Sequence, residues 1–215
     1  MNEPPRDPLV GPTDIALTVA VEQPRLRADA ARNRIRLLEV TARLADERGA
    51  ANVTMEEVAA AAGVGKGTVF RRFGDRTGLL MALLDHREQQ LQAAFLSGPP
   101  PLGPDVSAVE RLRAFGPAVI RHEMANGDLY LAAHADTDRR LTSGATLLRL
   151  SHVCMLLRRA KAPGDIELVA QTLLGYLDTN LVHHLRTRRG MPVERLEAGW
   201  CELVARLAPT GEGGV

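Results

Sequence analysis

Residues 54–73 read TMEEVAAAAGVGKGTVFRRF, and this stretch decides how the N-terminal part of the chain folds. Thr54 followed by Glu57 matches the reciprocal capping box, in which each side chain satisfies a backbone N–H at the start of a helix. A short helix is therefore predicted over Met55–Ala62, and the glycine that follows is expected to end it.

The turn at Gly63 and its neighbours are typical of a helix-turn-helix. This motif needs a small residue where its helices cross, a glycine that can adopt positive φ, and apolar residues that lock the helices together. Ala59 and Gly63 meet the first two demands, and the apolar set is Val58, Ala62, Val64 and Val69. The second helix, predicted over residues 65–72, carries four polar residues at its outer positions: Lys66, Thr68, Arg71 and Arg72. Such a helix fits the major groove, so double-stranded DNA is the predicted partner.

The charge distribution agrees with that partner. The formal net charge is +1, but residues 25–76 hold eleven Lys or Arg and seven acidic residues, which gives this window a net charge of +4. Residues 1–24 have a net charge of −3 and the remainder is neutral. The basic excess therefore coincides with the helix-turn-helix, as in many nucleic-acid-binding proteins. A solvated helix face is the alternative source of such an excess.

The whole chain is predicted to be all-α, because no segment shows the alternating pattern of a strand. With 45% hydrophobic residues the chain can form a substantial core. We predict a proline-rich mobile tail over residues 1–28, a helix-turn-helix domain over residues 29–76, and a helical regulatory and dimerisation domain over residues 77–210. The predicted helices are one of about twenty residues ending at Gly49, then 55–62, 65–72, 75–96, 107–125, 128–136, 143–160, 165–187 and 192–207.

The run TMEEVAAAAGVGKGTVFRRFGDRTGLL, residues 54–80, resembles the TetR-type transcriptional regulators, and the resemblance is specific over residues 32–80. It implies a three-helix DNA-binding domain, a fourth helix that links it to a helical regulatory domain, and a homodimer formed mainly by the last two long helices. By matching positions, Thr54 would contact phosphate, Lys66 and Thr68 would face the groove, and Arg76 would grip phosphate.

Two positions depart from the family pattern. Gly65 stands where Ser is usual, which removes a hydroxyl that could contact DNA, and Phe70 stands where a phosphate-contacting Tyr is usual. Phe70 is therefore expected to pack against sugar. Basic residues of the first helix, such as Arg32, would supply salt-dependent phosphate contacts. The residues predicted to bind DNA are Arg32, Thr54, Gly65, Lys66, Thr68, Phe70, Arg71, Arg72 and Arg76.

A small-molecule effector site is predicted in the regulatory domain. Phe115, Val119 and His122 share one helical face by their spacing, and Leu150, Cys154 and Tyr176 could meet them. His122 and Tyr176 would add polar groups to apolar walls, as ligand sites generally do. Packing in an ordinary core is the alternative for all six residues, and the effector itself cannot be named from the sequence.

Other functions find little support. No nucleophile elbow or Ser/His/Asp order appears, so the chain is not predicted to be an enzyme. The run from Gly63 to Thr68 lacks the glycine and hydroxyl spacing of an NTPase phosphate loop. The six histidines show no metal-ligand spacing and no cofactor is expected, while sensing of metal or oxidants stays open.

The two cysteines stand far apart, and no leader or membrane-spanning run is seen, which indicates a cytoplasmic protein. The function predicted is a ligand-responsive repressor, with an activator left open. The alternative is a helical ligand-carrier or protein-interaction domain without sequence-specific DNA binding.

Overall fold

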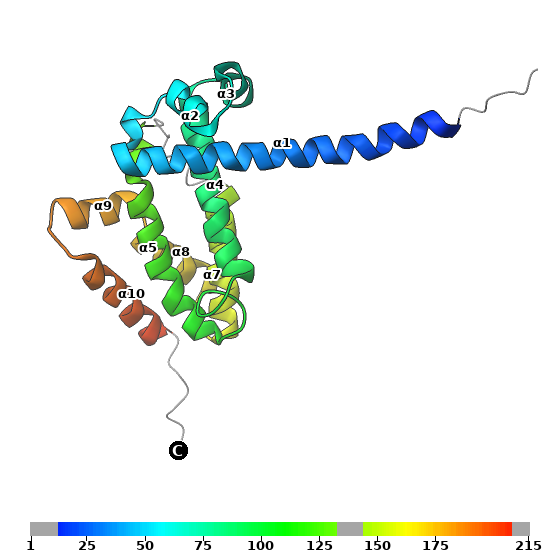
Figure 1. Ribbon diagram of the computed structural model, residues 1–215. Helices are drawn as coiled ribbons and strands as arrows, with labels where there is room; N and C mark the ends of the chain where they lie inside the picture. The colour runs from blue at the N-terminus through cyan, green and yellow to red at the C-terminus, as the bar shows by residue number, and fades with distance from the viewer. Residues whose placement is uncertain (1–12, 133–143, 208–215) are drawn as a thin grey trace, which may run out of the picture.

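The protein is helical throughout the part of the chain that the structure describes. A computed structural model describes residues 13–132 and 144–207 (Figure 1). No strand is found within those ranges, and the all-α prediction is confirmed. The helices are α1 (Thr13–Arg48), the 3-10 helix η1 (Ala50–Asn52), α2 (Met55–Ala62), α3 (Lys66–Phe73), α4 (Arg76–Ser97), α5 (Ala108–Ala132), α7 (Gly144–Arg159), α8 (Ile166–Tyr176), α9 (Thr179–Thr187) and α10 (Val193–Leu207).

Two hydrophobic cores hold these helices together, and α4 contributes to both. The first core lies among α1, α2, α3 and the start of α4, and includes Leu38 and Val69. The second lies among the end of α4 and the helices α5 and α7–α10, and includes Trp200. On α4 itself, Leu79 belongs to the first core and Phe95 to the second. Packing therefore continues across the domain boundary predicted between residues 76 and 77.

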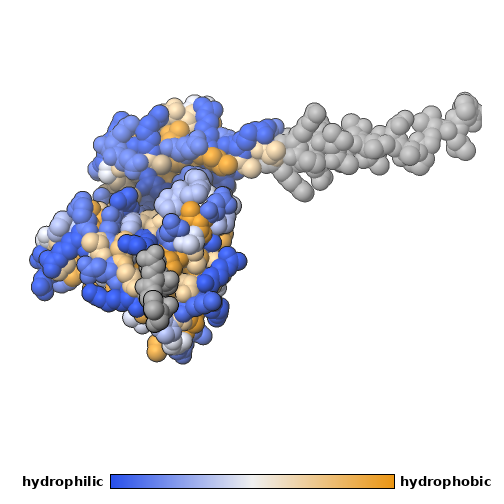
Figure 2. All heavy atoms as spheres, turned by 90° about the horizontal axis from the view of Figure 1, so that it is seen from below, coloured by the Kyte–Doolittle hydropathy of each residue, from blue (hydrophilic) through white to orange (hydrophobic). Residues whose placement is uncertain are grey.

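The helix pair α2–α3 occupies one end of the molecule. Figure 1 shows α1 lying across that end, with α2 and α3 above it and α4, α5 and α7–α10 below. Figure 2 views the molecule from below, where hydrophilic areas alternate with several small hydrophobic ones. The short helices of the motif are thus placed away from the second core.

The first helix begins earlier than predicted. The mobile tail predicted over residues 1–28 is wrong for residues 13–28, because α1 begins at Thr13 and continues to Arg48. Residues 13–23 contain no proline, and a single proline at Pro24 removes only one backbone N–H from a long helix. The other four prolines behind the prediction lie in residues 1–12, which fall outside the described residues.

A single helix replaces two predicted ones in the middle of the chain. The helices predicted over 107–125 and 128–136 form one continuous α5 up to Ala132, and residues 133–136 lie outside the described part of the chain. Gly127 lies in the gap between the two predicted ranges. A glycine in a helix interior costs about 1 kcal/mol relative to Ala, which tertiary packing easily offsets.

Helix α10 supports α5 where Pro117 interrupts its hydrogen bonding. Pro117 cannot donate to the carbonyl of Arg113, and the thiol of Cys201 on α10 donates to that carbonyl over 3.8 Å. One residue earlier on α5, the indole N–H of Trp200 donates to the carbonyl of Leu112 over 2.7 Å. Two donors from α10 therefore reach the weak point of α5.

The predicted helix over 165–187 is wrong as a single unit, because it is two helices, α8 and α9. The chain turns at Leu177, whose N–H donates to the carbonyl of Leu174 over 3.0 Å. The Asp178 carboxylate then accepts hydrogen bonds from the N–H groups of Asn180 and Leu181, which begins α9. The helices predicted over 143–160 and 192–207 are found within one residue of those bounds at each end.

His152 on α7 is buried among aromatic rings without a hydrogen bond. Its side chain is 4% exposed, and neither ring nitrogen has a partner in the described part of the chain. The ring centroids of Phe95 and Phe115 lie 4.5 and 5.5 Å from that of His152. Burial, assisted by the positive charge of Arg111, lowers the pKa of His152 to about 4. The ring is therefore neutral at pH 7.

This histidine should make the fold sensitive to acid. The unfolded chain binds a proton at His152 near pH 6.5, and the folded chain does so only near pH 4. The free energy of unfolding should then fall by on the order of 2 kcal/mol as the pH is lowered through that window. His152→Phe should remove this part of the pH dependence in urea unfolding, while exposed His184→Gln should keep it. The same pH dependence in His152→Phe and the parent would assign it to other groups.

Candidate DNA-binding surface

Both ends of α2 are fixed by the residues that the sequence points to. The Thr54 hydroxyl accepts from the N–H of Glu57 over 3.2 Å, and the Glu57 carboxylate accepts from the N–H of Thr54 over 3.2 Å. Gly63 ends the helix in the left-handed conformation, with a φ of 65°. The capping box and the glycine turn are thereby confirmed, and the turn leads directly into α3.

Helix α3 buries one face and exposes the other. Val69 and Phe73 are buried in the first core, and the Arg34 guanidinium of α1 lies 5.2 Å from the centroid of the Phe73 ring. Lys66 and Arg71 are exposed, and Phe70 is 37% exposed. The exposed face is therefore mixed, with one aromatic ring between two cations.

Four residues on this side of α3 form two contacting pairs, and we call them the α3 outer cluster: Lys66 with Phe70, and Thr68 with Arg71. The Lys66 ammonium lies 5.4 Å from the centroid of the Phe70 ring, and Arg71 donates to the Thr68 hydroxyl over 3.3 Å. Gly65 precedes them with an extended backbone and no side-chain cap. Five of the nine residues predicted to bind DNA thus lie together on one exposed surface.

Two other predicted residues point elsewhere. Arg72 donates to the carbonyl of Ala30 on α1 over 2.8 Å. Arg76 donates to the carbonyls of Val53 and Ala50 over 2.8 and 2.7 Å, and these bonds tie α4 to η1. Both arginines therefore have structural roles that the sequence does not reveal, and their contacts with DNA stay predictions.

The last two predicted residues are Thr54, the N-cap of α2, and Arg32 on α1. Thr54 serves the capping box, and Arg32 forms an exposed ion pair with Asp29 one turn earlier on α1. Sequence reasoning missed Glu56 on α2, whose carboxylate pairs with Lys66. The hydrogen bond from Lys66 lowers the pKa of Glu56. No sequence pattern signals this pair, because only the turn at Gly63 brings the two residues together.

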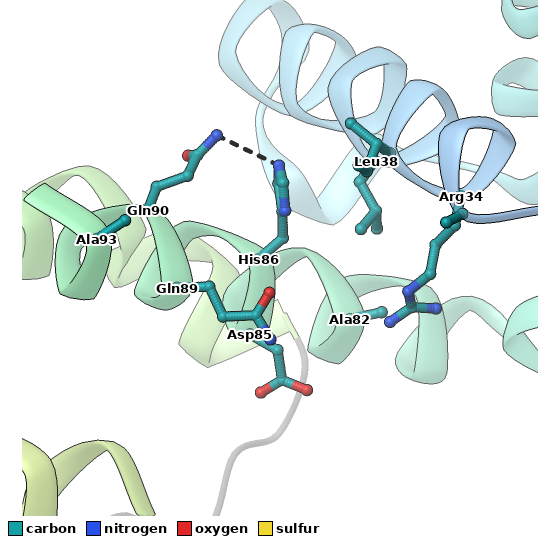
Figure 3. Close-up of a pocket in the computed structure, with 10 residues that line it drawn as sticks. Arg34, Leu38, Ala82, Asp85, His86, Gln89, Gln90 and Ala93 are labelled. Atoms are coloured by element: carbon teal, nitrogen blue, oxygen red, sulfur yellow. Dashed lines mark hydrogen bonds between the residues drawn. The ribbon is translucent and has the colours of Figure 1, made fainter. Parts of the chain in front are cut away.

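A groove separates α1 from α4 next to the motif. Its volume is about 390 Å³, and Figure 3 shows Arg34 and Leu38 of α1 facing Ala82, Asp85 and His86 of α4 across it. Further along α4, His86 and Gln90 are hydrogen-bonded over 3.2 Å. Contact between α1 and α4 is therefore interrupted by a partly polar space, which leaves α4 less tightly held on this side.

The six residues predicted to line an effector site do not surround one cavity among those found in the described residues. Phe115, Val119 and Cys154 are buried in the second core, against which Leu150 also packs. The Tyr176 hydroxyl donates to the carbonyl of Leu196 over 2.7 Å. The remaining residue, His122, lies 3.3 Å from the Glu88 carboxylate. Val119 and His122 line two different cavities.

A buried network of charges joins α4 to the second core. The Arg149 guanidinium of α7 pairs with the carboxylates of Glu88 on α4 and Glu123 on α5, and the Glu123 contact is 2.8 Å. Burial opposes the ionisation of Glu88, but the hydrogen bond with His122 and the charge of Arg149 lower its pKa to about 2. Glu123 and Arg149 also line a cavity of about 190 Å³ with Thr179. Sequence reasoning missed Glu88 and Arg149 entirely.

The described residues contain neither a metal-ligand cluster nor a helix suited to a membrane. Within residues 13–132 and 144–207, no group of three or more His, Cys, Asp or Glu residues could hold a metal ion. No helix in those ranges is long and apolar enough to cross a membrane. Both cysteines are free thiols, with Cys154 buried and Cys201 half-buried.

Known proteins share the motif. Residues 37–83, from α1 to α4, match the family described as bacterial regulatory proteins of the tetR family. The matched segment therefore resembles the N-terminal, DNA-binding part of tetR-family regulators. The chain is also 41% identical over 54 residues to an HTH-type transcriptional regulator of Staphylococcus aureus (strain USA300). That alignment covers 25% of this chain and only 29% of the length of the relative.

The fold of the remaining helices is also that of TetR-family proteins. A TetR-family regulator from Rhodococcus sp. superposes with a TM-score of 0.62 at 20% identity, covering 82% of this chain and 99% of that one. The TetR-family regulator SCO4454 from Streptomyces coelicolor gives 0.58 at 19% identity, covering 83% and 95%. A regulator from Saccharomonospora viridis, solved in complex with choline, gives 0.59 at 19% identity, covering 81% and 96%. At these identities the superpositions show a shared fold.

Proposed function

We propose that the protein is a transcriptional repressor that binds operator DNA as a homodimer and releases it when a small molecule binds the helical body. The observation that carries this proposal is the α3 outer cluster, which presents two cations, a hydroxyl and an aromatic ring on the exposed face of the second helix of the motif. Arg and Lys can read guanine, and apolar groups can contact thymine methyls.

The ion pair between Lys66 and Glu56 bears on how DNA is read. Both side chains are more than half exposed, so the pair contributes little to stability. In the major groove, the Lys66 ammonium would either leave the Glu56 carboxylate to donate to a base, or donate to a base while Glu56 continues to orient it.

In a dimer the two α3 helices would lie about 34–36 Å apart, one helical turn of DNA.

Exposed leucines on two neighbouring helices support the dimer. Leu168 on α8 is 65% exposed, and Leu181 on α9 is 40% exposed. Exposed apolar groups of this size commonly mark protein interfaces. The homodimer would pair the α8–α9 region and α10 of one subunit with those of its partner.

The effector response would pass through α4. Glu88 links this helix to Arg149 on α7, and the neighbouring Arg87 donates to Asp46 on α1 over 2.8 Å and to Asn126 on α5 over 3.0 Å. A ligand that prefers one placement of α4 would lower operator affinity by the same factor that DNA lowers ligand affinity. The choline-bound regulator from Saccharomonospora viridis supports the expectation of a small-molecule site.

The experiment that tests the proposal is a binding titration with promoter duplex and scrambled duplex of equal length at two salt concentrations. We expect a preference for the promoter of about a thousandfold. Lys66→Ala should reduce that preference by roughly 5- to 150-fold, because one base contact contributes about 1–3 kcal/mol of discrimination. Arg158→Ala on α7, an exposed arginine remote from the motif and from the proposed dimer interface, is the matched control and should change nothing.

Sequence-blind binding by the parent protein would contradict the proposal and favour a helical carrier or protein-interaction domain. A reporter gene under the same promoter distinguishes repression from activation. Deletion of the gene should raise reporter output for a repressor, and a fall would identify an activator.

A further inference from the structure

A second cavity, partly open to solvent, lies between α5 and α9, and Glu123 of the buried charge network also lines it. Its volume is about 260 Å³. Met124, Gly127 and Val182 give it apolar walls, while the hydroxyl residues Thr179 and Thr187 add polar edges. A space with apolar walls and few polar groups is the usual form of a small-molecule site.

Arg186 is the unusual member of this lining. It lies in the last turn of α9, where a cation could simply interact with the negative helix end. Its guanidinium instead reaches α5, where one Nη1 hydrogen bond of 3.0 Å goes to the Sδ atom of Met124. A thioether is a weak acceptor. The Nε atom is buried and has no hydrogen-bond partner in the described residues.

No anion in the described part of the chain offsets the charge of Arg186. None of the ion pairs found there includes it. Glu123 also lines the cavity, but its carboxylate pairs with Arg149 and accepts from the Thr179 hydroxyl. Arg186 is half-buried, and its buried Nε–H lacks an acceptor, so an anion in the cavity would supply both that acceptor and a counter-charge.

We propose that the cavity between α5 and α9 binds a small carboxylate, with the Arg186 guanidinium as its anion-binding group. The planar fork of arginine donates two parallel hydrogen bonds to a carboxylate. The hydrocarbon part of the ligand would lie against Met124 and Val182. A volume of about 260 Å³ suits a compound of roughly ten non-hydrogen atoms. Binding of the carboxylate is argued from the cavity alone. Only its role as the effector that releases DNA rests on the proposed function.

Isothermal titration with three probes of equal chain length tests the proposal in the absence of DNA. The probes are hexanoate, 1-hexanol and hexylamine, which differ only in the head group. We expect hexanoate to bind at least about tenfold more tightly than either of the others, because only its head group pairs with the guanidinium. Arg186→Gln should weaken hexanoate binding at least about tenfold.

Arg189→Gln is the matched control, since Arg189 is an exposed arginine three residues away. It should bind hexanoate as the parent does. Arg186→Lys keeps the charge but not the fork, so it should fall between the parent and Arg186→Gln. Circular dichroism melts of each variant establish that it is folded.

Equal affinity for hexanoate and hexanol, unchanged affinity in folded Arg186→Gln, or no binding of any probe at millimolar concentration would each overturn the proposal. The titration contains no DNA, so its result is independent of operator binding. A protein that binds hexanoate but no promoter would contradict the proposed function alone, and the reverse result would contradict this inference alone.

Discussion

Replacement of Arg149 by Met should lower the free energy of unfolding by about 3–5 kcal/mol. Arg149 is 14% exposed and lies between Glu88 and Glu123, whose side chains are 12% and 3% exposed. Without the guanidinium, two carboxylates remain largely out of water with no cation between them. Urea unfolding followed by circular dichroism at pH 7 measures the loss.

Two comparisons make this result specific to the buried charges. Arg121→Met removes a bidentate pair with Glu197, but Arg121 is 69% exposed, so the loss should stay within about 1 kcal/mol. Adding Glu88→Gln and Glu123→Gln to Arg149→Met should restore much of the stability, since the two buried carboxylate charges are then gone. Equal losses in Arg149→Met and Arg121→Met would contradict the burial argument.

The pH dependence of the same variant has a definite sign. In the parent, the Glu88 pKa is lowered to about 2, so this residue stabilises the fold at neutral pH and loses that effect as the pH falls toward 2. In Arg149→Met the lowering by the guanidinium is absent, and burial favours the protonated carboxyl. The gap in stability between parent and variant should therefore narrow between pH 7 and pH 4.5.

The network also explains how two distant parts of the molecule are connected. Glu88 and Arg87 are neighbours on α4, yet one side chain contacts α7 and the other contacts α1 and α5. A shift of α4 near these residues would change contacts on both cores at once. The groove between α1 and α4 in Figure 3 leaves space on the side nearer the motif.

Local signals predicted the N-terminal motif well because each is physical and short in range. Thr54 with Glu57 fixes where α2 begins, and Gly63 fixes where it ends, so the predicted bounds of α2 are those found. The exposed face of α3 followed from helical periodicity alone. Arg72 and Arg76 show the limit of this reasoning, since their carbonyl partners are 42 and 23 to 26 residues away.

The helices of the second core were harder to predict because their features depend on long-range contacts. The break between α8 and α9 had a local signal, the capping residue Asp178, that hydrophobic periodicity obscured. The effector residues were chosen by helical spacing, which cannot separate a cavity wall from a core. Phe115 and Val119 are fully buried, whereas Arg186, which does line a cavity, was not among the residues chosen.

Gly78→Ala should disable the motif more severely than any change to its exposed residues. A Cβ atom at Gly78 would lie 2.1 Å from the carbonyl oxygen of Phe73, which is backbone at the end of α3. The turn between α3 and α4 would have to move, which overpacking of this kind makes costly by about 3 kcal/mol. Because that turn sets where α3 stands relative to α4, promoter affinity should also fall by more than about a hundredfold.

The matched control is Gly127→Ala on α5, where an added Cβ meets no atom within 4 Å. That change should stabilise the protein by roughly 0.5–1 kcal/mol, because alanine is the better helix former. Urea unfolding and fluorescence anisotropy with promoter duplex measure both variants. If folded Gly78→Ala bound the promoter as tightly as the parent, the junction between α3 and α4 would not position the reading helix, and the role proposed here for α4 would fail with it.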